Sequence, residues 1–258
     1  MVKLLLQGSS GPEVVELRKR LAKTLGADAK MFALPSNSDT FDATLASAVR
    51  HWQSNIGIIA DGVVGPYCQS LLALIKLPVF ALRADEVQHL FPATKPSNVL
   101  RYLPYVAAAL TSEGLTTIPL ILAALGTIRA ETEGFVPISE YPSQFNTLPG
   151  LPAFSAYDAG TDKGKNLGNI NPGDGARFRG RGFVQLTGRS NYQKYASRIG
   201  VDIIGSPDLA NAPEVAAVLL AMFLGDRREA LTAALTATPP DYRKARRLVN
   251  GGAHGLDS

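Results

Sequence analysis

Apolar residues recur at helical spacing through most of this chain, and proline and glycine mark where such stretches begin and end. In the first stretch, Pro12 suits the first turn of a helix and Gly26 suits its end. The apolar face between them is formed by Val14, Leu17, Leu21 and Leu25. A second face, followed by Gly57, is formed by Phe41, Leu45, Val49 and Trp52. Turn signals at Asp61-Gly62 and Gly65-Pro66 precede a third, short helix.

The helical pattern resumes after a segment that contains several prolines. This segment, residues 76–95, is typical of a linker. Beyond it, Thr117 can cap a helix that has Pro119 in its first turn. The sequence therefore predicts an all-α (mainly helical) protein, with a three-helix module over residues 1–75 and a second helical domain over residues 96–258.

The composition fits a packed globular protein. The chain has 258 residues, of which 46% are hydrophobic and 19% charged, enough for one large domain or two modest ones. Its one cysteine, Cys68, rules out an internal disulfide, and three widely spaced histidines form no zinc motif with it. We therefore expect no metal and no other cofactor, and neither a zinc amidase nor a cysteine peptidase.

The net charge of +4 and the isoelectric point of about 9.2 have two interpretations. One is a mildly basic soluble protein; the other is attraction to an anionic polymer such as a cell wall or nucleic acid. The arginine clusters at 177–181, 227–228 and 243–247 have no ladder of aromatic residues, so nucleic-acid binding is not expected. The N-terminal apolar run is too short for a signal peptide, and no stretch approaches the about 20 apolar residues of a membrane helix.

Glu131 is the first candidate for chemistry. It stands at the end of the helix that begins near Thr117, in line with Ile128, Ala124 and Ile121. Its carboxyl group therefore projects from the buried side of that helix. General acid catalysis requires a carboxyl group that keeps its proton near neutral pH, and burial favours that form. The alternative is a structural ion pair between Glu131 and an arginine.

A second carboxylate and a glycine-rich segment complete the candidate site. Glu140 lies in a loop, where it is either a catalytic group or a solvated carboxylate. The segment GDGARFRGRGFVQLTGRSNY, residues 173–192, carries Gln185, Thr187 and Asn191. Cleavage of a glycosidic bond needs one carboxyl group to protonate the leaving oxygen and another to handle water or to form a glycosyl intermediate. The pair of glutamates therefore suggests a sugar-cleaving enzyme.

The N-terminal part resembles the three-helix peptidoglycan-binding domain of cell-wall enzymes. Three pieces carry the resemblance in order: GSSG at 8–11, AVRHWQ at 48–53 and DGVVGP at 61–66. The chain departs from the family at Arg18, where Gln is common, and at Cys68, where Thr is common. The resemblance implies a cell-wall-binding rim at the last of these pieces, for which a plain tight turn is the alternative. The implied rim residues are Asp61, Gly62, Val64 and Gly65.

The remainder resembles glycoside hydrolase family 19, the chitinase family with a lysozyme-like helical core. Residues 173–192 are similar to its GRG-x-x-QL-[ST]-x-x-x-NY segment, and AET at 130–132 is similar to its His-Glu-Thr segment, with Ala130 in place of the His. LVNGG at 248–252 is similar to its Asn-Gly-Gly segment. The resemblance implies a lysozyme-like helical catalytic domain, nearer to phage endolysins and bacterial lysozymes than to plant chitinases.

The resemblance also implies a role for each matching residue. Glu131 is implied as the general acid, Glu140 as the general base that activates water, and Thr187 as the hydroxyl that helps to hold this water. The implied substrate-binding residues are Arg181, Gln185, Asn191 and Asn250. The position of Tyr157 suggests a face for stacking against a sugar. The family inverts the anomeric centre, which requires carboxylates about 6.5–9.5 Å apart with a water molecule between them.

One departure leaves the partner of Glu131 open. The family often has Glu where this chain has His254, and usually an arginine beyond it that pairs with the catalytic acid. Either a different group, such as Arg247, orients Glu131, or a residue following Ser258 does.

These features predict a phage endolysin that hydrolyses the β-1,4 bond between N-acetylmuramic acid and N-acetylglucosamine in bacterial peptidoglycan. We expect a monomer without stable membrane insertion, held in the host cytoplasm until a holin releases it to its partner, the wall. A chitinase, a lytic transglycosylase with one catalytic Glu, and a binding-only protein are the alternatives. The joint presence of Glu131, Glu140 and Thr187 argues against the last of these.

Overall fold

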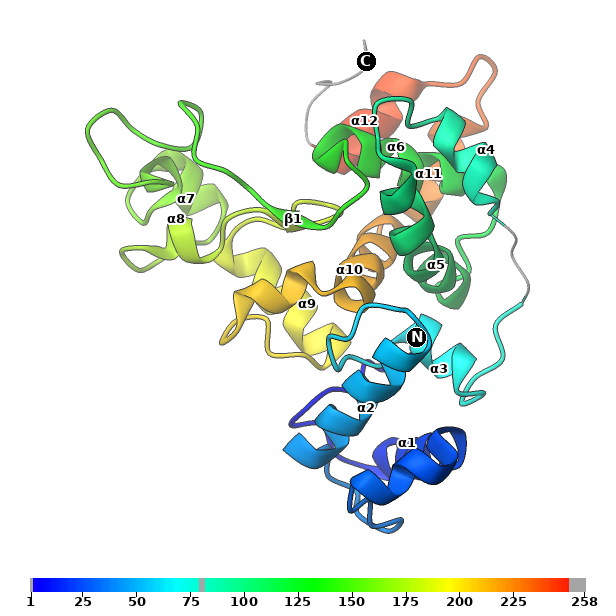
Figure 1. Ribbon diagram of the computed structural model, residues 1–258. Helices are drawn as coiled ribbons and strands as arrows, with labels where there is room; N and C mark the ends of the chain where they lie inside the picture. Colours follow the sequence, from blue (N-terminus) through cyan, green and yellow to red (C-terminus); the bar gives the residue numbers. More distant parts are fainter. Residues whose placement is uncertain (1, 79–81, 251–258) are drawn as a thin grey trace.

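The chain folds into a mainly helical structure, as its apolar spacing predicts (Figure 1). The computed structural model describes residues 2–78 and 82–250. Two short strands, β1 (Ile138–Ser139) and β2 (Arg181–Gly182), pair in an antiparallel arrangement. Helices therefore supply most of the packing, and the strand pair brings two loops together that are far apart in the sequence.

The N-terminal module is a small helical unit with its own core. It contains α1 (Pro12–Leu25), the 3-10 helix η1 (Gly26–Met31), α2 (Ala43–Asn55) and α3 (Pro66–Leu71). The predicted ends of α1, at Pro12 and Gly26, are confirmed, and Asp42 caps α2 by accepting the N–H of Leu45 at 2.8 Å. The predicted apolar faces meet in a core that includes Val14, Leu17, Leu21, Phe41, Leu45, Val49 and Trp52.

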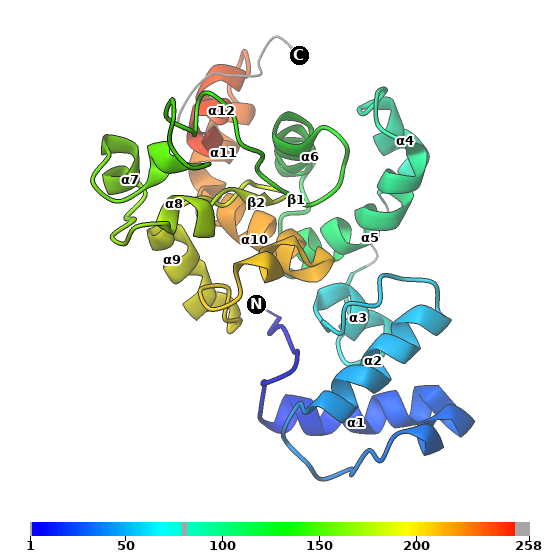
Figure 2. The same ribbon diagram turned by 60° about the vertical axis from the view of Figure 1, so that its left-hand side comes forward.

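The larger part of the chain is built around one buried helix, α10. The elements of this part are α4 (Ala84–His89), α5 (Pro96–Ser112), α6 (Ile118–Thr132), β1, η2 (Ser155–Tyr157), α7 (Asp162–Asn166), α8 (Asp174–Arg177), β2, α9 (Arg189–Ile199), η3 (Pro207–Asn211), α10 (Pro213–Gly225), α11 (Arg228–Leu235) and α12 (Tyr242–Asn250). Because α10 is apolar around its circumference, it can pack on several sides at once. It contacts α5, α6, α11, η3 and β2. Of these, α5, α11 and β2 lie beside α10 in Figure 2.

Residues 76–95, predicted as a linker, contain a packed helix. Val87 of α4 and Phe91 after it are buried in the core of the larger domain. The ring of Phe91 packs edge-on against the ring of Phe135, with the centroids 4.9 Å apart. Val87 and Phe91, which follow Pro78, thus pack in the core of the larger domain, and α4 packs against α5. The folded domain therefore begins at α4, earlier than residue 96.

A buried carboxylate joins the module to the larger domain. Glu214, at the start of α10, is fully buried and accepts the backbone N–H groups of Tyr67 at 3.3 Å and Cys68 at 2.7 Å. These groups lie in the first turn of α3, where a helix has no acceptors of its own. Gly65 permits the approach, because a Cβ atom there would lie 2.5 Å from Glu214 Oε2. In Figure 1, α3 lies next to α5, which it contacts.

The structure also bears on membrane and metal binding. Within residues 2–78 and 82–250, no helix has both the length and the apolar character to cross a membrane. In the same residues, no three His, Cys, Asp or Glu side chains are grouped so as to hold a metal ion.

Candidate active site

Glu131 opens onto a cleft that the glycine-rich loop also lines. It lies in the last turn of α6, and the residues behind it on the same face are buried, as predicted: Ile121, Ala124 and Ile128. The cleft has a volume of about 260 Å³. Its lining residues include Glu131, Leu167, Gln185, Thr187, Asn191, Phe223 and Val249. The structure therefore brings Glu131 together with three of the polar residues that the sequence singles out.

Arg246 pairs with the Glu131 carboxyl group. From α12, its Nη2 atom lies 3.4 Å from Glu131 Oε1, and the two side chains are 13% and 20% exposed. The expectation that Arg247 orients Glu131 is corrected, because consecutive residues on a helix point about 100° apart and Arg247 is exposed. The ion pair between Glu131 and an arginine, which the sequence offers as the alternative to an acid role, is therefore present, and it fixes the direction of the Glu131 carboxyl group.

Glu140 is held by three hydrogen-bond donors. Its Oε1 atom accepts the side-chain amide of Asn146 at 2.9 Å and the hydroxyl of Tyr157 at 3.0 Å. Its Oε2 atom accepts the backbone N–H of Gly180 at 3.1 Å. The backbone N–H of Glu140 donates to the Gly180 carbonyl at 2.8 Å, next to the β1–β2 pair. Glu140 is therefore a positioned carboxylate and not a freely solvated one.

Asn146 is a positioning residue that the sequence did not reveal, and Tyr157 makes a contact with Glu140 that the sequence did not reveal either. Asn146 is 1% exposed, and it also donates to the Tyr141 carbonyl at 2.9 Å, which folds the loop back on Glu140. Tyr157 donates its hydroxyl to Glu140. Burial and the neighbouring carboxylate raise the pKa of Tyr157 above its usual range, so this donor keeps its proton. Tyr157 therefore helps to hold the candidate base, and its sugar-stacking role stays a prediction.

Three side-chain oxygen atoms converge beside Gly180. A Cβ atom there would lie 2.7 Å from Gln185 Oε1, 3.2 Å from Glu140 Oε2 and 3.2 Å from Thr187 Oγ1. Glycine leaves this space open. Thr187 donates its hydroxyl to the Gln185 carbonyl at 2.8 Å, and the hydroxyl oxygen can still accept a hydrogen bond from water. Thr187 therefore lies beside Glu140 and also lines the cleft of Glu131.

Glycine conformations and one ion pair shape this loop. Gly182 has a φ of 78°, and a Cβ atom there would lie 2.8 Å from the Ala210 carbonyl oxygen, while Gly188 has a φ of 90°. Asp174 and Arg189 form a two-pronged pair with contacts of 2.6 and 2.7 Å. Burial opposes ionisation of Asp174, but hydrogen bonds from Arg189 and from backbone N–H groups hold its pKa at about 2. The pair anchors the start of the loop to α9.

The prediction that Arg181 binds substrate is corrected. Arg181 is 3% exposed, and its guanidinium group donates inward to the carboxylate of Asp208 at 2.9 Å and the hydroxyl of Tyr192 at 3.0 Å. It also donates to the Arg177 carbonyl at 2.9 Å. A buried guanidinium needs such partners. Arg181 therefore anchors β2 to η3 and α9, a role that the short motif around it does not reveal.

Gln185 and Asn191 line the cleft, but their amide groups also bind the backbone. Gln185 donates to the carbonyls of Ile138 and Gly182, both at 3.0 Å, and so clamps the two strands. Asn191 donates to the Thr187 carbonyl at 2.8 Å. Both side chains thus support the loop as well as facing the cavity. Asn250 closes α12, and its side chain lies outside the described residues.

The predicted cell-wall-binding rim of the module serves the fold instead. Its buried or half-buried residues are Asp61, Gly62, Val64 and Gly65. Asp61 accepts the side-chain amide of Gln53 at 3.0 Å, and burial raises the pKa of Asp61. Val64 and Leu5 exchange two backbone hydrogen bonds, at 2.8 and 3.0 Å. These inward contacts leave little of the turn for a polymer to touch, so the prediction of a ligand-binding rim here is corrected.

Comparison with known proteins identifies the N-terminal module. Residues 10–72 match the model of the family described as "Putative peptidoglycan binding domain". The chain carries an N-terminal domain of this type. The resemblance predicted for residues 1–75 is confirmed at this level.

The chain is also similar to chitinases, over a short stretch in sequence and weakly in structure. The chain is 44% identical to Chitinase 8 of Oryza sativa subsp. japonica over 46 residues, which span 18% of this chain and 18% of the rice protein. Chitinase C of Streptomyces griseus has a TM-score of 0.39 at 17% identity, over 67% of each chain. A mutant of chitinase C has a TM-score of 0.41 at the same identity and coverage.

Proposed function

We propose that this protein hydrolyses the β-1,4 glycosidic bond between N-acetylmuramic acid and N-acetylglucosamine in bacterial peptidoglycan. The observation that carries the proposal is the placement of two glutamates around Thr187. Glu131 lines the same cleft as Thr187, and the Glu140 carboxylate lies with the Thr187 hydroxyl beside Gly180. The peptidoglycan-binding domain over residues 10–72 supports the wall as the polymer, because a tether raises the enzyme's local concentration at the scissile bonds.

The mechanism assigns one proton transfer to each glutamate. Glu131 donates its proton to the leaving glycosidic oxygen, and Arg246 stabilises the carboxylate that remains. Glu140 takes a proton from a water molecule that Thr187 helps to hold, and this water attacks the anomeric carbon from the opposite face. Asn146 and Tyr157 keep Glu140 aimed at that water. The product has the inverted anomeric configuration.

A chitinase is the second candidate function. The 46-residue similarity to Chitinase 8 of rice favours it, since chitin also has β-1,4 bonds between N-acetylated sugars. To separate the two, purified peptidoglycan and chitin oligosaccharides are each incubated with the enzyme, and new reducing ends are counted. We expect faster release from peptidoglycan. Faster cleavage of chitin oligosaccharides would overturn the choice of substrate while leaving the two-carboxylate mechanism in place.

The cellular setting forms part of the proposal. We propose a monomeric phage endolysin, held in the bacterial cytoplasm and released to the wall by a second protein. The positive net charge supports attraction to an anionic wall. Cells that express the chain should therefore lyse only after their membrane is permeabilised; lysis that begins with expression alone would contradict this setting.

Replacement of Arg246 should impair hydrolysis far more than replacement of Arg247. Both variants, Arg246→Gln and Arg247→Gln, remove one positive charge from α12, but only Arg246 contacts the candidate acid. We expect Arg246→Gln to lower kcat on peptidoglycan by about 10- to 100-fold, because the acid loses its orientation, and Arg247→Gln to stay near the wild-type rate. Equal losses in the two variants would show that α12 contributes only its charge.

A further inference from the structure

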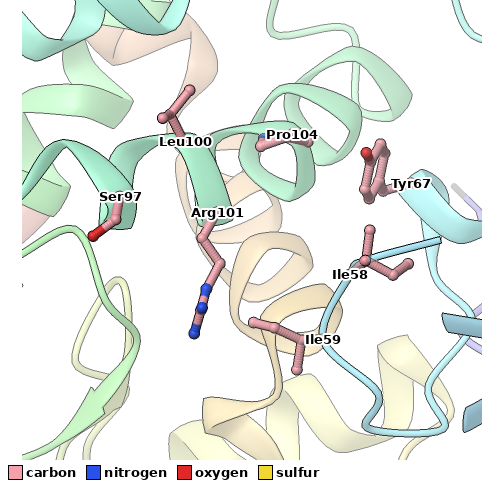
Figure 3. A pocket seen from close by; sticks show the side chains of 8 residues that line it. Ile58, Ile59, Tyr67, Ser97, Leu100, Arg101 and Pro104 are labelled. Carbon is pink, nitrogen blue, oxygen red and sulfur yellow. The ribbon is translucent and has the colours of Figure 1, made fainter. Parts of the chain in front are cut away.

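A second cavity lies at the junction of the module and α5. Its volume is about 540 Å³, larger than that of the Glu131 cleft and within the range of about 300–1,000 Å³ that small-ligand sites occupy. Figure 3 shows the side chains that face it. Its walls are formed by Ile58, Ile59 and Tyr67 of the module and by Leu100, Arg101 and Pro104 of α5. Neither domain alone supplies both walls.

The two walls are fixed to each other through Tyr105 and Glu214, which do not themselves line the cavity. The backbone N–H of Ile59 donates to the hydroxyl of Tyr105 in α5 at 3.3 Å. The ring of Tyr67 packs edge-on against the ring of Tyr105, with the centroids 5.0 Å apart. Glu214 holds the backbone of Tyr67 from the other side. The walls of this cavity are therefore ordered before a ligand binds, and binding costs little conformational entropy of the protein.

Arg101 gives the cavity one positive charge. It projects from α5 on the side of the cavity where Ile59 lies, as Figure 3 shows, and it is exposed. Within residues 2–78 and 82–250, its guanidinium group has no hydrogen-bond or ion-pair partner. A guanidinium group presents several donors that match a carboxylate. The charge in this cavity is therefore free to meet an anion.

The rest of the lining favours small apolar groups over sugar hydroxyls. Leu100 is 64% exposed at the rim, and Ile58, Ile59 and Pro104 add apolar surface. Apart from Arg101, the only polar side chains of the lining are the hydroxyls of Ser97 and Tyr67. A sugar ring would find only these three side chains to pair with its hydroxyls. A short peptide that carries methyl groups and ends in a carboxylate fits both parts of the lining.

We infer that this junction cavity binds the alanine-rich stem peptide of peptidoglycan, with Arg101 on a peptide carboxylate and the apolar wall against the alanine methyl groups. The inference rests on the proposed function for the choice of polymer. It also assigns a role to the junction. A stem peptide bound there would hold its glycan strand on the protein through residues that do not line the Glu131 cleft. The cavity then recognises the stem peptide of the wall and not its glycan chain.

Titration of the full chain with a synthetic pentapeptide, L-Ala-γ-D-Glu-L-Lys-D-Ala-D-Ala, tests this inference by calorimetry. We expect saturable binding, weakened by about 10-fold or more in Arg101→Gln, because a charge-assisted contact is lost. Leu100→Ser, at an exposed position, should also weaken binding. Arg20→Gln, which removes the same charge from α1, is the matched control and should bind like the wild type.

Three outcomes would overturn the inference: no binding of the pentapeptide, equal binding by Arg101→Gln and the wild type, or inorganic phosphate binding as tightly as the peptide. The readout does not depend on hydrolysis. If the chain binds the peptide but does not cut peptidoglycan, the proposed function fails and the cavity assignment stands. If it cuts peptidoglycan but does not bind the peptide, only the cavity assignment fails.

Discussion

Glu131→Gln should lower the rate of peptidoglycan hydrolysis by about 10²- to 10⁴-fold, the range that general acid catalysis contributes. The amide has nearly the same size as the carboxyl group but cannot donate an acidic proton to the leaving oxygen. Because the side chain is only partly buried and its ion pair with Arg246 is long, we expect the free energy of unfolding to change by no more than about 1 kcal/mol. Initial rates of reducing-end release and urea unfolding measure the two quantities.

A matched control and an activated substrate make this prediction specific. Glu133→Gln changes an exposed carboxyl group two residues away and should keep the wild-type rate. A 2,4-dinitrophenyl glycoside has a leaving group that needs no proton, so it should restore cleavage by Glu131→Gln and not by Glu140→Gln, which lacks the base. A Glu131→Gln variant that cleaves neither substrate, or a Glu140→Gln variant with full activity, would contradict the assigned roles.

The stability of the folded chain should include a contribution from Glu214 that falls as the pH rises from 4.5 to 7. Burial raises the pKa of Glu214 from 4.5 to about 7, while hydrogen bonds from Cys68 and Tyr67 oppose the shift. In this window the unfolded chain has released the proton and the folded chain still holds it. The contribution is therefore complete below pH 4.5 and lost above pH 7, a change of about 3 kcal/mol. Urea midpoints across this range measure it.

Glu214→Gln provides the comparison for this pH dependence. The amide keeps a carbonyl acceptor for the backbone N–H of Cys68 but does not titrate, so its stability should lack the Glu214 slope. Glu229→Gln, at an exposed position on α11, should keep the wild-type slope. Asp174, with its pKa of about 2, titrates below the window and does not mask the effect. Parallel profiles for the wild type and Glu214→Gln would mean that Glu214 does not titrate at the junction.

Several helices of the chain could be predicted because their signals are local. Pro12 and Gly26 set the ends of α1, and α6 begins directly after Thr117, as the Thr117-Pro119 pair predicts. The apolar line behind Glu131 follows from helical geometry alone. Thr117 makes no side-chain cap, so the position of the helix was predictable although the capping contact was not.

The errors concern contacts between distant segments, which periodicity does not encode. Arg246, not Arg247, reaches Glu131: Arg246 follows the buried Ala245 and lies one helical turn before Val249, which lines the Glu131 cleft, whereas Arg247 is exposed. Tyr157 contacts Glu140 across a loop of irregular structure, although 17 residues separate the two in the sequence. The turn at Asp61 contains residues typical of an exposed loop. Gly65, four residues further on, is nevertheless buried, because the Glu214 side chain of α10 packs against it. In each case a tertiary partner decided the role.

Mass spectrometry of peptidoglycan digested by the wild-type chain is the measurement that decides whether two carboxylates hydrolyse the glycan. We predict muropeptides with a new reducing end on N-acetylmuramic acid, which borohydride reduces, and none of these products with Glu131→Gln. Anhydro-sugars, lighter by one water, would show that the enzyme is a transglycosylase without a catalytic water. Fragments cut only within the peptides would show that the pair of glutamates does not act on the glycan at all.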